Sequence, residues 1–485
     1  MLSLDQRIVL RDLGNVMLVI GFVSFIEIIP SIVFKEFFAV RIFLLLGLTS
    51  VSVGYLLRYF FKGAKEPELR HAMIIAAISW LIAPLIGSIP FILIEKMSFL
   101  DSFFEGMSGW TGTGLTMVST PENLHHSMQF WRSLMQWVGG VGVIVLMVSI
   151  ITRPGTGLFR LYKSEAREER IYPSIVSTVR TIWWIYLLLT GVSFVLLYVS
   201  GMPFWDSLNH SMTGIATGGF TIKSKSLGSY NNILIELMTV PIMIMGAIPF
   251  LIHYKVLKGD IKAFLKDIQC KALFSLIILG VLILVGENYI YYKDISLSLR
   301  YSGFQFISGL TCTGFQTFDV KKWSETSRLL IGLAMIIGGA AGSTAGGIKL
   351  ARMVIFYKGV GWWFRRASLP LSAVVYFTLG DKKLSDEELN RELGEVALIA
   401  VLWIIFLFLG ILVLLHLVPS NYTLGDVFFE VASAQGNVGL STGITNPSMP
   451  ALAKIMLIFN MWVGRLEIIP VLMFLRSFIR GMGPV

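Results

Sequence analysis

Four glycine residues, each followed directly by leucine or phenylalanine, mark the places where this sequence could do chemistry. They are Gly114, Gly219, Gly314 and Gly439. A small hydroxyl residue stands six positions before each glycine, and the loops around them carry no acidic side chain. Glycine permits backbone angles that turn carbonyl oxygens inward, and a ring of carbonyls can replace the water shell of a monovalent cation. The pattern therefore predicts a cation site made of backbone carbonyls, not a divalent-cation site built on acidic side chains.

The four glycines belong to a longer internal repeat. An aspartate stands thirteen residues before the glycine in three copies, and Tyr301 takes its place in the third copy. The copies begin at Asp101, Asp206, Tyr301 and Asp426. Because the spacing holds without a gap, four registered copies indicate a repeat architecture rather than chance similarity.

A short helix is expected before each loop. About eleven residues at about 1.5 Å each reach about 16 Å, which is roughly half a hydrocarbon core. The chain must then return as a non-helical loop, which is tolerated at membrane depth only inside protein or beside water. Four such loops on one axis would form the carbonyl ring, and the helix C-termini would add partial negative charge. The residues expected to start these helices are Ser98, Pro203, Ser298 and Thr423.

The composition indicates an all-α polytopic membrane protein. The chain is 55% hydrophobic and 14% charged, whereas soluble proteins are about 25% charged. Apolar runs of about twenty residues recur along its length. We predict two N-terminal spans and then four units, each a span, a short helix, a loop and a second span. The predicted divisions are 1–70, 71–172, 173–267, 268–393 and 394–485.

The net charge of +10 is explained by membrane topology and does not indicate nucleic acid. Basic residues cluster after the second span and after the first three repeats, at 62–70, 153–170, 255–271 and 352–391. All four clusters fall on one side if the spans alternate from a cytoplasmic N-terminus, as the positive-inside rule requires. With Cys270 and Cys312 as the only cysteines, a disulfide or metal framework is not expected.

A run of small residues from Gly338 to Lys349 interrupts the second span of the third unit. It contains five glycines together with Ser343 and Thr344, and each glycine in a helix interior costs about 1 kcal/mol relative to alanine. We therefore predict a break in this helix near mid-membrane. The run is not a phosphate-binding loop, because Ile348 separates Gly347 from the lysine and no Ser or Thr follows.

Arg465 is a charged residue within the last apolar span. A charge at that depth is expensive and usually functional. A local ion pair with Glu467 is disfavoured, because residues two apart on a helix do not face each other. We expect Arg465 to point at the pore axis below the carbonyl ring, near the 338–349 loop.

Four span–loop–span units with one such glycine per loop resemble the Trk/Ktr/HKT superfamily of potassium transporters, and the resemblance covers nearly the whole chain. It implies a pseudo-fourfold pore that carries K⁺, with no organic cofactor. None of the loops reads TVGYG, as a tetrameric potassium channel would. The selectivity-filter residues implied by the resemblance are Thr111, Gly112, Thr113, Gly114, Ala216, Thr217, Gly218, Gly219, Thr311, Cys312, Thr313, Gly314, Gly436, Asn437, Val438 and Gly439.

The resemblance also implies a gate and partners. The 338–349 loop would obstruct the pore beneath the filter. The implied setting is a bacterial inner membrane, with contacts to lipid, a homodimer of this chain, and a cytosolic nucleotide-binding regulatory ring of the TrkA type. The expected gate residues are Gly338, Gly339, Gly342, Ser343, Thr344, Gly346, Gly347, Lys349 and Arg465.

Other interpretations remain open at this stage. A secondary transporter coupled to H⁺ or Na⁺, with a mid-membrane substrate site, would also contain broken helices, although its repeats are typically inverted and these four share one direction. The loops could be spacers between transporter helices, and the 338–349 run could be a kink for close packing. We find no catalytic constellation that would indicate an enzyme.

Overall fold

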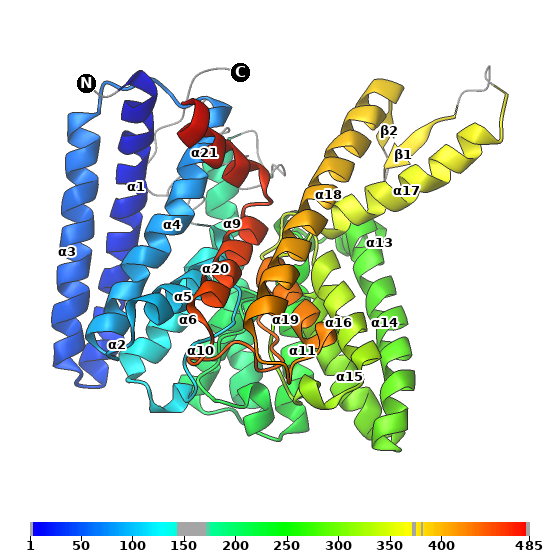
Figure 1. The fold of residues 1–485 in the computed structure, drawn as a ribbon, viewed down its shortest axis with the longest axis horizontal. Helices are drawn as coiled ribbons and strands as arrows, with labels where there is room; N and C mark the ends of the chain where they lie inside the picture. Colours follow the sequence, from blue (N-terminus) through cyan, green and yellow to red (C-terminus); the bar gives the residue numbers. More distant parts are fainter. Residues whose placement is uncertain (1–2, 143–170, 172–173, 371–374, 380–381, 482–485) are drawn as a thin grey trace.

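The structure is a computed structural model that describes residues 3–142, 171, 174–370, 375–379 and 382–481. These residues form helices and one antiparallel hairpin, in which Phe377 lies opposite Leu384. The hairpin strands are β1 (Phe377–Leu379) and β2 (Lys382–Leu384). The predicted all-α class is therefore confirmed apart from this hairpin, which extends with α17 (Leu350–Ala367) away from the body of the molecule (Figure 1).

The N-terminal helices form a layer at one side of the molecule (Figure 1). They are α1 (Leu4–Ile26), α2 (Ile28–Val33) and α3 (Phe37–Phe60). A Cβ on Gly14 would lie 2.8 Å from the carbonyl oxygen of Gly54, and one on Gly54 would lie 2.7 Å from that of Gly14. Such reciprocal close approach of small residues is a common way for membrane helices to pack.

Each of the four units begins with a long apolar helix. These first helices are α4 (Leu69–Leu93), α9 (Ile175–Val199), α14 (Ile268–Tyr292) and α18 (Asp386–Leu417). The short helices that follow contain between 12 and 16 residues and are mostly buried. They are α5 (Phe99–Thr111), α10 (Phe204–Ile215), α15 (Ile295–Leu310) and α19 (Leu424–Gly436).

Three of the four predicted helix starts are correct. Ser98, Pro203 and Thr423 are the N-cap residues of α5, α10 and α19. In the third unit the predicted start at Ser298 is wrong, because α15 begins one turn earlier. Asp294 caps this helix, and its side chain accepts the backbone N–H groups of Ser296 and Leu297 at 2.7 and 3.1 Å.

The second helices of the units are interrupted more often than the sequence analysis predicted. The pair α11–α12 bends by 106° and the pair α20–α21 by 114°, in addition to the predicted break between α16 and α17. The bends follow local backbone features: Pro249 precedes α12, while Glu467 and Ile468 between α20 and α21 have left-handed backbone angles. The segments are α6 (His126–Val141), α11 (Ile233–Ala247), α12 (Phe250–Leu257), α16 (Glu325–Ile337), α17 (Leu350–Ala367), α20 (Ala451–Arg465) and α21 (Ile469–Arg480).

The first unit is described only in part. Helix α6 ends at Val141, and Gly142 after it has a positive φ of 104°. The remainder of its predicted second span, together with the basic cluster at 153–170, lies outside the described residues. Short elements complete the chain: α13 (Ile261–Lys266) and the 3₁₀ turns η1 (Pro121–Asn123), η2 (Ser226–Ser229) and η3 (Val320–Lys322).

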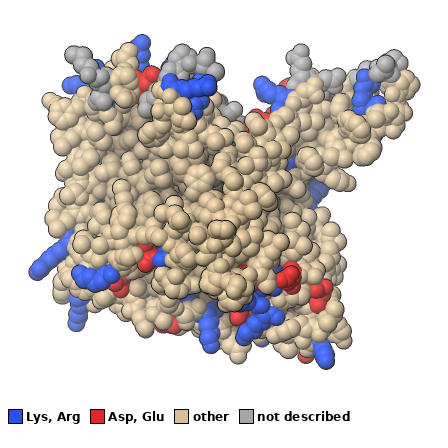
Figure 2. All heavy atoms as spheres, in the orientation of Figure 1, with Lys and Arg blue, Asp and Glu red and all other residues tan. Residues whose placement is uncertain are grey.

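The described helices are suited to a membrane. Six of them are long and apolar enough to cross it, or eight if each bent pair counts as one span. Figure 2 shows Lys, Arg, Asp and Glu gathered mainly at the two ends of the visible face, with a largely uncharged band between them. The loop residues that follow the short helices are buried, so the four loops lie in the interior of the protein.

Candidate functional site

The four repeat glycines form a closed ring at the ends of the short helices. Their φ angles are all positive, between 77° and 100°. A Cβ on any of them would overlap a backbone carbonyl of the next unit. The carbonyls met by Gly114, Gly219, Gly314 and Gly439 belong to Gly218, Thr313, Val438 and Thr113, respectively. The contacts thus run from unit 1 to 2, 3, 4 and back to 1, and only glycine fits at each step.

The backbone follows the same path in all four loop segments, defined here as residues 111–114, 216–219, 311–314 and 436–439. The residue two positions before each glycine is left-handed as well, with φ between 50° and 67° at Gly112, Thr217, Cys312 and Asn437. The backbone N–H of the residue directly before each ring glycine donates to the backbone carbonyl of the hydroxyl residue six positions before that glycine, at 2.8–2.9 Å. These acceptors are Ser108, Thr213, Ser308 and Ser433. The ring therefore has fourfold backbone geometry despite unequal side chains.

Side chains support the segments in different ways. In the first and third segments two threonine hydroxyls bond each other, Thr111 to Thr113 at 2.7 Å and Thr311 to Thr313 at 2.8 Å. In the fourth, the amide of Asn437 donates to the Thr113 hydroxyl at 2.9 Å. The second segment lacks an equivalent pair, because Ala216 and Gly218 replace the threonines.

A polar residue behind each segment was missed by the sequence analysis. It stands nine residues before the glycine, at Glu105, His210, Gln305 and Glu430, and all four are buried. In three units this side chain accepts the backbone N–H of the residue three positions after the glycine. The donors are Met117 at 2.9 Å, Thr317 at 3.2 Å and Thr442 at 2.9 Å. The aligned copies carry a polar residue at this position in every unit, and this pattern could have identified the position from the sequence.

Glu105 also forms a buried ion pair with Arg132 of α6 at 2.7 Å, with both side chains at most 2% exposed. Arg132 donates onward to the carbonyl of Thr221 at 2.9 Å and lies over the Phe220 ring at 4.1 Å. One buried pair therefore ties the first segment to the second.

Replacing Glu105 by alanine is expected to destabilise the protein by about 3–5 kcal/mol, because it leaves Arg132 buried without its carboxylate. The measurement is a thermal unfolding curve of the purified protein in detergent. Glu325→Ala is the matched control, since that carboxylate is 64% exposed and pairs only loosely with Arg328 at 3.8 Å. Equal shifts for the two variants would contradict the prediction.

A second ring of contacts surrounds the outer ends of the short helices. The fourth residue of each second helix bonds a residue in the N-terminal half of the short helix in the next unit. Lys454 bonds Asp101 at 2.5 Å, Gln129 bonds Trp205 at 2.8 Å, Glu236 bonds Arg300 at 2.7 Å and Arg328 bonds Asp426. Two of the three repeat aspartates, Asp101 and Asp426, take part in this outer ring. In the third unit the charges are reversed, with the base Arg300 on the short helix and the acid Glu236 on its neighbour.

The connections after the loops are joined in the same order. Glu122 accepts both the backbone N–H and the hydroxyl of Ser224, at 2.9 and 2.8 Å. The Ser226 hydroxyl accepts the N–H of Gln316 at 3.0 Å, and the Gln316 side chain reaches the carbonyl of Ser441 at 3.3 Å. Burial raises the pKa of Glu122, but hydrogen bonds, including those from Ser224, outweigh it and leave the pKa lowered. These connections border a cavity of about 170 Å³ lined by all four repeat glycines.

The second helices share a glycine at one register position, and the sequence analysis considered only the one that belongs to the 338–349 run. It stands ten residues after the outer-ring position, at Gly139, Gly246, Gly338 and Gly464. A Cβ on Gly139, Gly246 or Gly464 would crowd the carbonyl of Trp110, Ile215 or Gln435, near the end of the short helix of the same unit. In units 1, 2 and 4 the glycine therefore lets the second helix pack closely against the end of the short helix.

The 338–349 loop leaves and re-enters its helix at a narrow neck. The N–H groups of Ile348, Lys349 and Leu350 donate to the carbonyls of Ile336, Ile337 and Gly339 at 2.9–3.1 Å. A Cβ on Gly338 would lie 2.8 Å from the Cα of Gly347, so the two strands of the neck are in contact. The predicted break is thus a closed loop on an otherwise helical path.

The body of the loop is bonded chiefly to unit 2. Ala340 donates its N–H to the carbonyl of Ala247 at 3.0 Å, and Thr344 donates its own to that of Gly246 at 3.2 Å. The Thr344 hydroxyl reaches the carbonyl of Ile215 at 3.0 Å and the hydroxyl of Thr217 at 3.2 Å. A Cβ on Gly346 would overlap the carbonyl of Gly436. The loop therefore lies directly against two of the four loop segments.

Within the loop, polar side chains bond backbone groups of the loop itself. The Ser343 hydroxyl donates to the carbonyl of Ala340 at 2.6 Å, and the Lys349 ammonium donates to that of Ala345. The N–H of Ala341 donates to the side chain of Gln269 at 2.8 Å. The N–H of Phe250 also donates to the carbonyl of Gly342 at 3.0 Å, which adds a further bond from the loop to unit 2.

Arg465 connects three units at this level. Its guanidinium donates to the carbonyl of Thr344 at 3.3 Å, to that of Gly140 at 3.1 Å and to that of Gly139. It also lies 5.2 Å from the centre of the Trp80 ring. Glu467, the alternative partner in the sequence analysis, pairs instead with Arg352 of α17.

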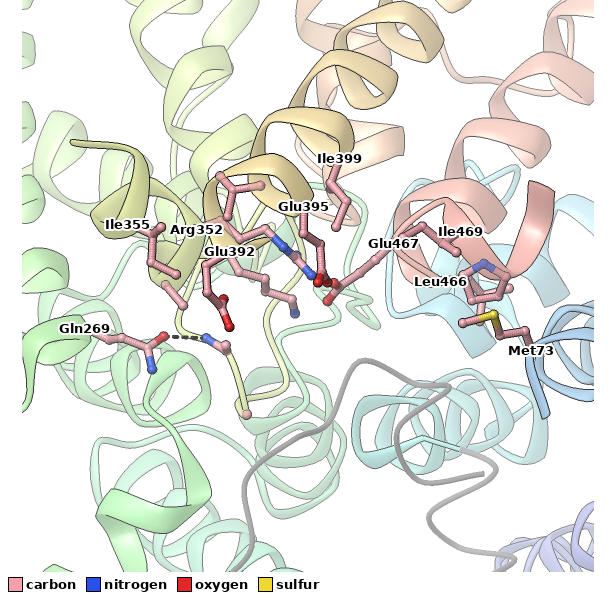
Figure 3. A pocket seen from close by; sticks show the side chains of 16 residues that line it. Met73, Gln269, Arg352, Ile355, Glu392, Glu395, Ile399, Leu466, Glu467 and Ile469 are labelled. Carbon is pink, nitrogen blue, oxygen red and sulfur yellow. Dashed lines mark hydrogen bonds and ion pairs between the residues drawn. The ribbon is translucent and has the colours of Figure 1, made fainter. Parts of the chain in front are cut away.

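An inner cavity of about 310 Å³ lies beside the loop. Ala341 and Gly342 of the loop form part of its wall, and Figure 3 shows the side chains of Glu392, Arg352 and Glu467 around it. The 338–349 loop therefore borders this cavity at Ala341 and Gly342 and contacts the fourth loop segment at Gly346.

Comparison with known proteins assigns a family to this arrangement. The model of the TrkH family, described as cation transport protein, matches residues 41–479. An uncharacterised cation transporter of Methanocaldococcus jannaschii is 38% identical over 96% of this chain and 95% of its own. The Trk system potassium uptake protein TrkH of Escherichia coli is 28% identical over 96% and 97%. The crystal structure of the potassium transporter TrkH from Vibrio parahaemolyticus superposes with a TM-score of 0.81 at 25% identity, covering 97% of this chain and 98% of its own. The chain therefore belongs to the TrkH family of cation transport proteins.

Proposed function

We propose that this chain conducts potassium ions across the cell membrane through the ring formed by the four loop segments. The observation that carries the proposal is the closed ring of glycine contacts, in which each glycine packs against a carbonyl of the next unit. Backbone carbonyls arranged in this way suit a dehydrated monovalent cation. The names of the Escherichia coli and Vibrio parahaemolyticus relatives point to the same ion.

In this proposal the sixteen residues of the loop segments are the selectivity filter, and the 338–349 loop with Arg465 is the gate. The loop lies against the segments on their inner side, and the guanidinium of Arg465 places a positive charge there. A fixed cation beneath the filter repels a passing one. Displacement of the loop and of Arg465 would join the inner cavity to the ring.

The same proposal covers topology, unit boundaries and assembly. The N-terminus faces the cytoplasm, because the basic residues that follow α3, α11 and α16 then share the inner side. The units are divided at residues 71, 173, 268 and 394. The chain acts as a homodimer, and its basic inner face binds a nucleotide-binding regulatory ring of the TrkA type. The residues proposed for such docking are Arg160, Lys163, Arg167, Lys258, Lys262, Lys266, Arg365 and Arg366. The first three lie outside the described residues.

Uptake of radioactive rubidium into proteoliposomes that contain the purified chain tests the conduction. We expect uptake that K⁺ inhibits at lower concentration than Na⁺ does, and that does not require a pH gradient. Equal inhibition by K⁺ and Na⁺ would contradict potassium selectivity. Uptake that depends on a pH or sodium gradient would favour the coupled secondary transporter instead.

A further inference from the structure

Helix α6 of unit 1 holds the loop segment of unit 2 through one buried side chain, Gln136. Its amide nitrogen donates to the carbonyl of Gly218 at 2.5 Å, and its amide oxygen accepts the N–H of Phe220 at 2.9 Å. Gln136 is fully buried. A single side chain therefore bonds the backbone on both sides of the ring glycine Gly219.

The second segment is the one that most needs such support. It contains Gly218 and Gly219 in succession, whereas the other segments have threonine or valine before the ring glycine. Consecutive glycines have the largest conformational freedom of any pair. The threonine-to-threonine bond of the first and third segments has no counterpart here. A precise ion site needs its backbone fixed from outside when its own side chains cannot do so.

Gln136 also occupies the space that a side chain at 218 would fill. A Cβ on Gly218 would lie 2.5 Å from the amide carbon and oxygen of Gln136 and 3.0 Å from its Cβ. A glutamine from the neighbouring unit thus takes the place of the missing side chain. Glutamine at 136 and glycine at 218 are therefore a matched pair.

The register of the second helices supports this pairing. The residue equivalent to Gln136, seven positions after the outer-ring residue, is methionine in the other units: Met243, Met335 and Met461. Each methionine is buried and belongs to the unit that precedes a segment with threonine or valine before its glycine. Glutamine appears only where the next segment has glycine at that position.

The carbonyl of Gly218 is also distinguished electrostatically. One of its lone pairs is engaged by an amide N–H, while no side-chain donor reaches the equivalent carbonyls of Thr113, Thr313 and Val438 among the described residues. Arg132 of the same helix also donates to the backbone just after this segment, to the carbonyl of Thr221 at 2.9 Å. The ring therefore has one carbonyl whose direction is set by the preceding unit.

We infer that Gln136 is a positioning residue that determines ion selectivity, by fixing the backbone of residues 218–220 in the conformation that the carbonyl ring requires. This inference rests on the proposed function, since it assigns Gln136 a part in the same site. Gln136 does not contact the ion, and it acts through Gly218 and Phe220.

The test uses the residues found in the other units. Gln136→Met removes the clamp, and we expect it to raise the K⁺ concentration for half-maximal rubidium inhibition and to lower the ratio of K⁺ to Na⁺ uptake. Two hydrogen bonds contribute about 1–3 kcal/mol, which corresponds to roughly a five- to hundredfold change. Gly218→Thr alone should clash with Gln136 and reduce selectivity as well. The double variant Q136M/G218T recreates the methionine–threonine combination of the other units, so it should recover most of the selectivity.

Trp137→Phe is the matched control on the same helix. It removes a hydrogen bond to the Thr190 hydroxyl at 3.0 Å that does not involve the segments, so selectivity should stay unchanged. Additive losses in the double variant would overturn the inference, because independent sites add and a matched pair does not. Unchanged selectivity in Q136M would overturn it too.

A second measurement separates this inference from the proposed function. Hydrogen exchange followed by mass spectrometry should show faster exchange at 217–221 in Q136M than in the wild-type protein, and unchanged exchange at 312–316. If wild-type protein transports no K⁺, the proposed function fails, whereas the clamp is judged by this exchange alone. Wild-type exchange at 217–221 in Q136M would show that Gln136 does not fix the segment.

Discussion

Replacing Gly314 by serine is expected to abolish most of the preference for K⁺ over Na⁺ while leaving a folded protein. Gly314 has a φ of 80°, which a serine adopts only with strain of about 1–3 kcal/mol. Its Cβ would overlap the carbonyl of Val438, and the neighbouring atoms are backbone that cannot rotate away. Relief of the overlap must move the third and fourth segments apart, which changes the spacing of the carbonyl ring.

The measurement is the ratio of K⁺ to Na⁺ inhibition of rubidium uptake in proteoliposomes. A displacement that weakens K⁺ binding by about 1–3 kcal/mol lowers the ratio roughly five- to hundredfold. Gly303→Ser on α15, the short helix of the same unit, is the control, because a Cβ there meets only Val281 at an ordinary 3.8 Å. Wild-type selectivity in G314S would show that the ring does not select the ion at this position.

Removing residues 339–346 is expected to raise ion flux in the absence of any partner protein. Gly338 and Gly347 approach so closely that joining them directly requires little rearrangement, since consecutive Cα atoms are 3.8 Å apart and their neck is already in contact. The deletion takes away the bonds to unit 2 and the Thr344 carbonyl that Arg465 binds. The path from the inner cavity to the ring should then be open.

Arg465→Ala should raise the ion flux less than the deletion does, because it removes the charge but leaves the loop in place. Charged hydrogen bonds contribute about 1.5–3 kcal/mol, so a gain of roughly tenfold in the open population is expected. Arg476→Ala, which removes a charge from α21, is the control.

A protein that lacks residues 339–346 but has a normal unfolding curve and unaltered flux would refute the gate and leave the filter proposal standing. Loss of folding would instead support the interpretation as a packing kink.

The register of the repeat is what made the site predictable from sequence. Aligning four glycines placed the four loops, and the structure brings those four residues into one ring. Helix ends set by side-chain caps were also predictable, as at Ser98 and Thr423, because a cap is a local interaction. The start at Ser298 was wrong because a second capping residue, Asp294, stands one turn earlier.

Long-range contacts could not be predicted in this way. Gln136 and Gly218 are 82 residues apart, and nothing local to Gln136 indicates that partner. The bend after α20 was missed because no residue type in the sequence indicates it. Ile468 has a φ of 75°, which is unusual for a β-branched residue and is ordinarily expected only of glycine. The position held by Glu105 and Glu430 was visible in the alignment, but its role depends on a loop that folds back on the helix.

The outer ring of contacts gives the chain an order of assembly. Each of its contacts joins a second helix to the following unit, so three form between units adjacent in sequence, whereas the fourth joins Lys454 to Asp101 across 353 residues. During synthesis the N-terminal units emerge first. Asp101 therefore cannot bond Lys454 until the last unit has been synthesised. The carbonyl ring closes between Gly439 and Thr113 at the same stage. Under the proposed function, a nascent chain that lacks the final helices has an incomplete ring, and we expect it not to conduct until its translation is nearly finished.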